Sequence, residues 1–95
     1  MSILITKRVK VRDFEGTKKA AAKYAQKLKK AGCLTLKIYR SDDDPNFLLW
    51  LMEWESRAAF EALGNDVEYD INLMVGAVGA WNEVIWDLSD AVTLE

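Results

Sequence analysis

The stretch Asp44–Phe60, DPNFLLWLMEWESRAAF, decides the fold of this chain. Its middle, residues 47–54, has the length and the aromatic and aliphatic content of a β-strand. An antiparallel strand with one face in water alternates apolar and polar residues, but this strand is apolar on both faces. One face would carry Phe47, Leu49 and Leu51, and the other Leu48, Trp50, Met52 and Trp54. The sequence therefore predicts that something covers each face.

The rest of the chain supplies the neighbours of this strand. Alternating patterns predict strands over residues 3–11, 33–40 and 82–88. Residues 18–31 predict a helix that Thr17 caps and Gly32 ends, and Ser56 is the expected cap of a short helix over 57–63. Further helix is predicted over 65–81. This order predicts an α+β, ferredoxin-like βαββαβ fold, a four-stranded antiparallel sheet with helices on one face, in a single domain over residues 1–95.

Two helices cover one face of such a sheet, and a chain of 95 residues has nothing left for the other face. Exposing the second apolar row of residues 47–54 would leave a patch larger than monomeric proteins usually show. Burying each large apolar side chain is worth about 1.5–3 kcal/mol, which favours association. We therefore expect a homodimer, a dimeric α/β barrel, in which the second copy covers this face. A ligand pocket between sheet and helices is compatible with that assembly.

Composition and charge set further bounds. No apolar run reaches the roughly 18 residues of a membrane span, and we expect a cytoplasmic protein without a membrane partner. Residues 1–40 hold 12 of the 13 Lys and Arg, whereas residues 41–95 hold 13 of the 15 Asp and Glu. This asymmetry is compatible with a nucleic-acid or acidic partner. We favour two solvated faces and no nucleic-acid partner, because aromatic residues do not interleave with the basic ones.

The chain contains no histidine and a single cysteine, Cys33, which is expected to be buried at the start of a strand. It therefore has few ligands for zinc or haem, and we expect neither a metal site nor a cofactor. The consecutive acids Asp42, Asp43 and Asp44 lack the spacing of a calcium loop and are interpreted as a solvated connection.

The turn Asp44-Pro45-Asn46-Phe47, the strand end Glu53-Trp54, and Ser56-Arg57 followed by Ala59-Phe60 resemble the antibiotic biosynthesis monooxygenase type of dimeric α/β-barrel protein. The resemblance covers residues 33–63 in motif and the whole chain in topology. It implies cofactor-free oxidation of polycyclic aromatics or quinols, haem degradation, or a protein without known activity. The haem-degrading branch fits least, because its Asn, Trp and His set is incomplete without histidine.

The leading hypothesis is therefore a cofactor-independent, monooxygenase-like pocket protein for an aromatic or quinol-type substrate. In such an enzyme the substrate anion itself reduces oxygen, and the pocket stabilises that anion. The alternative is a homodimeric domain of the same fold that binds a ligand or a protein without catalysis. The missing histidine motivates this alternative, because many members of the family carry one after the Ala-Phe helix.

Candidate site residues follow from this hypothesis. Glu53 is the candidate catalytic residue, because it ends an apolar row and burial would suit it to proton transfer; the other interpretation is a partly exposed carboxylate at a strand end. Seven further residues are candidates for the pocket wall. The alternative interpretation is core or dimer packing for the tryptophans and an exposed polar position for the others. The seven are Trp50, Trp54, Trp81, Trp86, Tyr39, Arg40 and Asn72.

Overall fold

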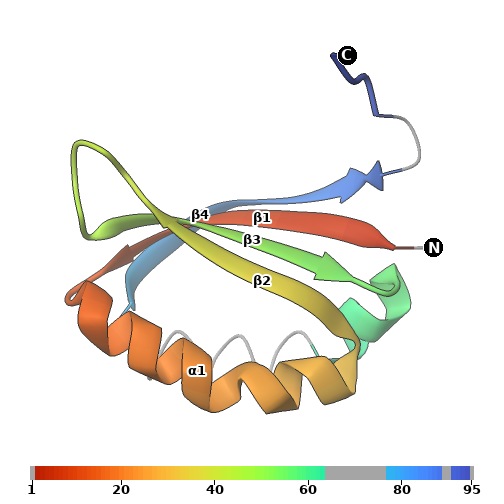
Figure 1. Ribbon diagram of the computed structural model, residues 1–95, viewed down its shortest axis with the longest axis horizontal. Helices are drawn as coiled ribbons and strands as arrows, with labels where there is room; N and C mark the ends of the chain where they lie inside the picture. The colour runs from red at the N-terminus through yellow and green to blue at the C-terminus, as the bar shows by residue number, and fades with distance from the viewer. Residues whose placement is uncertain (1, 64–76, 89–90, 95) are drawn as a thin grey trace.

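The computed structural model describes residues 2–63, 77–88 and 91–94, except the side chains of residues 77, 78, 80 and 81. Its elements are β1 (Ile3–Val11), α1 (Phe14–Ala31), β2 (Cys33–Arg40), β3 (Phe47–Trp54) and β4 (Ala77–Asp87), with a short helical segment over 57–63. The strands form one antiparallel sheet in the order β2-β3-β1-β4 (Figure 1). This is the expected ferredoxin-like βαββαβ arrangement. Among the described residues, no helix is long and apolar enough to cross a membrane.

The strand of the deciding stretch, β3, lies inside the sheet. It pairs with β1 along one edge, where Ile5 faces Met52, and with β2 along the other, where Ile38 faces Trp50. Both edges of β3 are therefore hydrogen-bonded, which fixes the direction of its side chains. Leu48, Trp50, Met52 and Trp54 point toward α1 and are buried. We call this side of the sheet the helix-facing side.

The other side of the sheet is called the open face, because no described helix covers it (Figure 1). Its middle rows are Leu4 with Glu53, Thr6 with Leu51, and Arg8 with Leu49. Large apolar side chains stay exposed here: Leu49 and Val84 are each 38% exposed, and Trp86 is 49% exposed. The prediction that one apolar face of β3 lacks a cover within the chain is confirmed for the described residues.

Helix α1 begins one turn earlier than predicted. Its N-cap is Asp13, whose carboxylate accepts hydrogen bonds from the backbone N–H groups of Glu15 and Gly16. The predicted cap, Thr17, is fully buried inside the helix, and its hydroxyl donates to the carbonyl of Asp13. The assignment of Thr17 was therefore wrong, because an aspartate four residues upstream satisfies the free N–H groups of the first turn. The end at Gly32 was right: this residue has φ 116.

The second half of the chain differs from the prediction at the bounds of its last strand, β4, which ends at Asp87 instead of residue 88. The Ser56 hydroxyl accepts from the N–H of Ala59, 3.0 Å away, which confirms the cap of the segment 57–63. Strand β4 begins at Ala77, so the last five residues of the predicted helix 65–81 are strand, and β4 starts five residues before the predicted residue 82. Gly79 disfavours helix there, and pairing with β1 gives Ala77, Gly79 and Ala80 ladder partners. Residues 65–76 lie outside the described residues.

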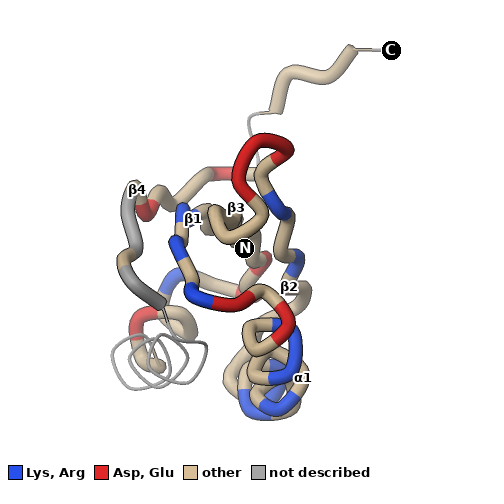
Figure 2. Tube along the Cα trace, turned by 90° about the vertical axis from the view of Figure 1, so that its left-hand side faces the viewer, with Lys and Arg blue, Asp and Glu red and all other residues tan. Residues whose placement is uncertain are grey.

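The basic and acidic residues are grouped by secondary-structure element and do not gather on a single surface. Basic residues mark α1 and parts of β1 and β2, and the acidic residues 42–44 mark the connection between β2 and β3 (Figure 2). Most lysines of α1 are exposed. The interpretation of this asymmetry as solvated charge stays a prediction.

Candidate functional site

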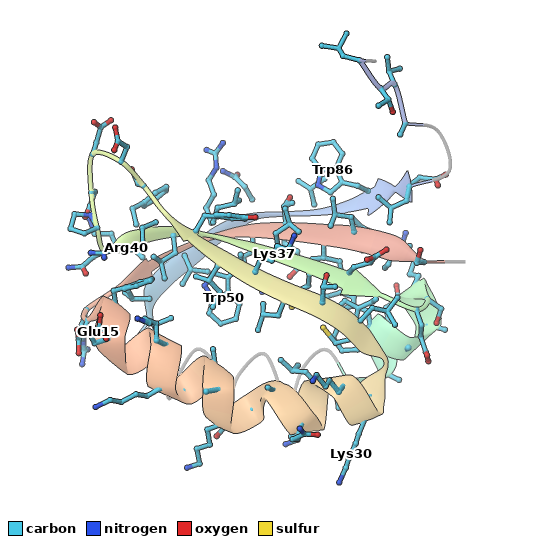
Figure 3. The ribbon with its side chains drawn as sticks, in the orientation of Figure 1. Glu15, Lys30, Lys37, Arg40, Trp50 and Trp86 are labelled. Carbon is cyan, nitrogen blue, oxygen red and sulfur yellow. The ribbon has the colours of Figure 1, made fainter. Side chains whose placement is uncertain are left out.

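The helix-facing side of β3 carries two indole groups with unpaired donors. Trp50 and Trp54 are 4% and 2% exposed, and neither Nε1–H has an acceptor in the described part of the chain. Trp50 points from the sheet toward α1 (Figure 3). The Trp54 ring meets the Phe60 ring edge-on, with centroids 5.5 Å apart. A buried donor without a partner costs about 1–3 kcal/mol, so these two N–H groups are the candidates on this side of β3 for donating to an acceptor atom from outside the described residues.

A buried cation lies beside these indoles. Lys7 faces Trp50 across the β1–β3 ladder, on the same side of the sheet, and is 6% exposed. Its Nζ lies 3.0 Å from Oε2 of Glu83 on β4, a carboxylate whose side chain is 38% exposed. A buried ammonium requires such a partner to remain charged.

A β-bulge brings Glu83 to Lys7. The register between β1 and β4 shifts between Thr6 and Arg8, where Thr6 pairs with Val84 but Arg8 pairs with Trp81. Two residues of β4, Asn82 and Glu83, therefore oppose the single residue Lys7. Asn82 has φ 55, a left-handed conformation that asparagine tolerates better than most residues. Such bulges often stand next to functional sites because they re-aim a side chain.

Lys7 was missed in the sequence-based list of candidates. The signal was present, because Lys7 interrupts the apolar row of Ile3, Ile5, Val9 and Val11. A charge in the middle of a core-facing row requires a buried partner or a function. Its partner Glu83 was not predictable, since the bulge that places it depends on long-range pairing.

A groove lies between α1 and the edge strand β2. It has a volume of about 400 Å³, and small side chains of α1, Ala21 and Ala25, leave its floor open. The Cys33 thiol lies in its wall, donates to the carbonyl of Thr35 at 3.3 Å, and has its pKa raised by burial. This expected buried position of Cys33 is confirmed. The remaining lining residues are Lys18, Leu28, Lys29, Leu34, Thr35, Leu36 and Ile38.

Several predicted site residues lie elsewhere. Glu53 is half-buried on the open face, in register with Leu4, and so points away from Trp50 and Trp54. Tyr39, 50% exposed, and Trp86 also lie on the open face, and the Trp86 Nε1–H donates to the Thr6 hydroxyl at 2.8 Å. Figure 3 shows Trp86 and Trp50 on opposite sides of the sheet. The predicted role of Glu53 stays a prediction, without the indoles as its neighbours.

The other candidates do not join the indoles either. The Arg40 guanidinium lies over the Phe14 ring, 4.2 Å from its centroid, and its Nε donates to the carbonyl of Pro45. Arg40 therefore ties the β2–β3 connection to the start of α1. Trp81 belongs to β4, but its side chain, like the whole of Asn72, lies outside the described residues.

The open face also has a hollow next to the bulge. Its volume is about 440 Å³, and Arg8, Leu49, Glu83 and Trp86 are among the residues that line it.

The acidic connection between β2 and β3 is a turn held by local hydrogen bonds and by Lys10 of β1. The Ser41 hydroxyl accepts from the N–H groups of Asp43 and Asp44, and the Asp44 carboxylate accepts from Lys10 Nζ at 2.7 Å. This hydrogen bond from Lys10, together with that from the N–H of Asn46, lowers the pKa of Asp44. Within residues 2–63, 77–88 and 91–94 there is no group of three or more His, Cys, Asp or Glu side chains placed to hold a metal ion.

Comparison with known proteins places this arrangement among solved folds. Residues 2–68 match the family model of the antibiotic biosynthesis monooxygenases. The structure superposes on SnoaB, a cofactor-independent oxygenase from Streptomyces nogalater, with a TM-score of 0.75 at 14% identity over 96% of both chains. At such identity the likeness shows the fold alone.

Two further solved structures share the fold. A conserved protein from Methanosarcina mazei Go1 has a TM-score of 0.65 at 15% identity, over 90% of this chain and 88% of that chain. Rv0793 from Mycobacterium tuberculosis has a TM-score of 0.61 at 16% identity, over 98% of this chain and 100% of that chain. No curated protein matches the sequence.

Proposed function

Because this chain belongs to the antibiotic biosynthesis monooxygenase family, we propose that it oxidises an aromatic or quinol-type substrate without metal, flavin or haem. The observation that carries the proposal is the pair of buried indole N–H groups of Trp50 and Trp54, which lack an acceptor in the described part of the chain. SnoaB, which shares the fold, is a cofactor-independent oxygenase.

The residues of the helix-facing side suit a phenolate or enolate. Both indoles offer a flat apolar surface and a single donor each, and the Lys7 ammonium supplies a positive charge beside Trp50. An electron-rich ring bound there keeps its oxygen as an anion, which lowers the cost of electron transfer to oxygen. The salt bridge to Glu83 holds Lys7 in place.

The reaction is proposed as the conversion of an anthrone-type methylene to a carbonyl. The anion donates one electron to O₂, and recombination of the two radicals forms a carbon–oxygen bond. In the overall balance the carbon keeps one oxygen atom, and its two hydrogens leave with the other oxygen as water. The substrate is the reductant and O₂ is the oxidant, so no other redox partner is required.

Oxygen uptake with anthrone and a panel of quinols tests this proposal. We expect enzyme-dependent consumption that EDTA does not change and that falls at least tenfold in Trp50→Phe. Trp86→Phe is the control, because that indole already donates to Thr6 on the other side of the sheet. No turnover above the spontaneous rate over the panel would contradict an oxygenase. Saturable quenching of tryptophan fluorescence in that case would favour the alternative of a domain that binds without catalysis.

We also propose that the protein is a homodimer that packs through its open faces. The exposed apolar side chains there, Leu49, Val84 and Trp86 with Tyr39, support this assembly. Sedimentation equilibrium is expected to give twice the chain mass of 10.8 kDa. A chain that stays monomeric at high micromolar concentration would contradict it.

A further inference from the structure

We propose that four exposed lysines of α1 form a docking surface for a short, carboxylate-rich segment of another protein. The four follow one another at helical spacings of four, four and three residues, and we call them the lysine row: Lys19, Lys23, Lys27 and Lys30. At about 100° per residue they fall within an arc of roughly 80° around the helix axis. The inference depends neither on the reaction nor on the dimer proposed above, and for these four residues it goes beyond the prediction of solvated charge.

The lysine row is accessible. All four of its side chains are exposed, whereas the buried residues of α1 are Thr17, Ala20 and Leu28. Lys30 extends from the helix away from the strands (Figure 3). Lys27 takes part in a further interaction, yet its side chain is still exposed. A partner can therefore reach the row without a change in the fold.

The charge pattern of the row is unfavourable for the helix itself. Side chains three or four residues apart are neighbours on a helix, and like charges at this spacing destabilise it. Lys23 has a lysine of the row on either side. The segment 57–63 shows the favourable pattern, because Arg57 and Glu61 form a salt bridge four residues apart. A helix surface that keeps its charges alike, at a cost in stability, is suited to an anionic partner.

The same pattern extends beyond the row. Between residues 16 and 41 the sequence has eight Lys and Arg and no Asp or Glu. Blue therefore marks α1 repeatedly in Figure 2, and red appears only at its first turn, at Glu15. The lysine row thus lies in a region of one sign of charge, which steers an anion toward it.

The composition of α1 favours carboxylates over two other anionic partners. In α1, which is described throughout, no large apolar side chain is exposed, so the helix lacks the apolar face that enters a membrane surface. Nor does it expose an aromatic ring on which a nucleic-acid base would stack. Every basic residue of α1 is a lysine, whereas bidentate binding of phosphate groups requires the guanidinium of arginine.

The length of the row fits a short partner segment. From Lys19 to Lys30 it spans about 16 Å at roughly 1.5 Å per residue, which an extended chain of about five residues covers at roughly 3.3 Å per residue. A longer polyanion reaches beyond the row, where the chain offers no net attraction because its formal net charge is -2. We therefore expect an acidic peptide segment to bind better than a nucleic acid.

Anisotropy titration of fluorescein-labelled octaglutamate with the full-length protein tests the inference. We expect one peptide per chain, bound with an affinity that falls at least tenfold between about 20 and about 200 mM salt. A triple variant with Lys19→Gln, Lys23→Gln and Lys30→Gln is expected to bind at least tenfold more weakly. Its far-UV circular dichroism spectrum should stay unchanged, since lysine and glutamine have similar helix propensities.

The matched control carries the same change of charge away from the row. It combines Arg12→Gln, Lys29→Gln and Arg57→Gln, all at exposed positions, and is expected to weaken octaglutamate binding less than threefold. Lys27 stays unchanged in both variants because of its further interaction. Equal weakening by the two triple variants would show that only the overall charge matters, and this overturns the inference.

Two further outcomes overturn it as well. Wild-type protein that leaves the anisotropy of octaglutamate unchanged at low salt has no such docking surface. Tighter binding of a DNA duplex or of phosphatidylserine vesicles than of octaglutamate, lost in the variant of the lysine row, would assign these residues to a different class of partner.

Discussion

Lys7 lies directly opposite Trp50 on the paired strands β1 and β3, and both side chains are buried on the helix-facing side of the sheet. A charged group and an indole N–H without an acceptor among the described residues thus share one small region of an otherwise apolar core. Core residues chosen for stability alone would be aliphatic at position 7, since burying an ion pair rarely stabilises a fold more than good apolar packing does. Lys7 is therefore a candidate functional residue.

Replacing Lys7 by methionine separates stability from activity. Glu83, one partner of Lys7, is partly exposed and remains solvated after the change, and methionine fills the apolar space, so we expect the free energy of unfolding to stay within about 1 kcal/mol of wild type or to rise. Oxygen uptake is expected to fall at least tenfold, because the substrate anion loses its cation. Urea unfolding and oxygen electrode measurements give the two values. Arg57→Met, which breaks the exposed pair with Glu61, should change neither by much; a Lys7→Met variant with full activity would remove Lys7 from the site.

Replacing Trp54 by phenylalanine removes an indole N–H that has no acceptor among the described residues. The loss of an unpaired N–H offsets part of the cost of the smaller ring, so we expect a destabilisation of only about 1–2 kcal/mol by chemical denaturation. Substrate affinity, followed by fluorescence titration, is expected to fall at least tenfold. Wild-type affinity in this variant would show that the Trp54 N–H does not donate to the substrate.

Gly32 is required by its backbone conformation. With φ 116, it ends α1 in a region that other residues rarely adopt, and an added Cβ would lie 2.8 Å from Oε1 of Glu55. We expect Gly32→Ala to lower the free energy of unfolding by about 1–2 kcal/mol, most of it from the backbone, because the Glu55 side chain can move. Gly16→Ala, where the new Cβ meets Asp13 at an ordinary 3.4 Å inside α1, is the matched control and is expected to be neutral or stabilising. Equal losses in both variants would contradict this account.

The Lys10–Asp44 pair predicts an acid dependence. The hydrogen bond from Lys10 lowers the pKa of Asp44 in the folded protein, so the ionised pair stabilises the fold above the unfolded pKa of about 4 and loses this effect as pH falls through the folded pKa. The stability difference between wild type and Lys10→Met should therefore be constant above pH about 5 and should shrink below pH about 4. Urea titrations of both proteins between pH 2.5 and 7 measure it. A difference that persists unchanged at the acid end would assign the effect to packing of the lysine stem.

The sequence predicted the sheet better than it predicted the site. Residues 3–11, 33–40 and 47–54 have strong strand patterns, and their bounds agree with β1, β2 and β3. The face of β3 that meets α1 was not predictable, because both of its faces are apolar and only pairing with β1 and β2 fixes them. Once fixed, that pairing placed Trp50 and Trp54 together and turned Glu53 away. The bulge at Asn82 and Glu83, which gives Lys7 its partner, leaves no local pattern in the sequence.

The sheet separates the described tryptophan side chains, so tryptophan fluorescence can report on each side of the sheet. Trp50 and Trp54 are shielded from solvent on one side, while Trp86 is about half exposed on the other. A water-soluble quencher such as acrylamide should reach Trp86 and spare the buried pair, so association of two copies should protect a quencher-accessible signal. An aromatic ligand on the helix-facing side should instead change the blue-shifted emission of the shielded indoles. The proposed subunit assembly and the proposed substrate binding would thus affect different tryptophan signals of one unlabelled sample.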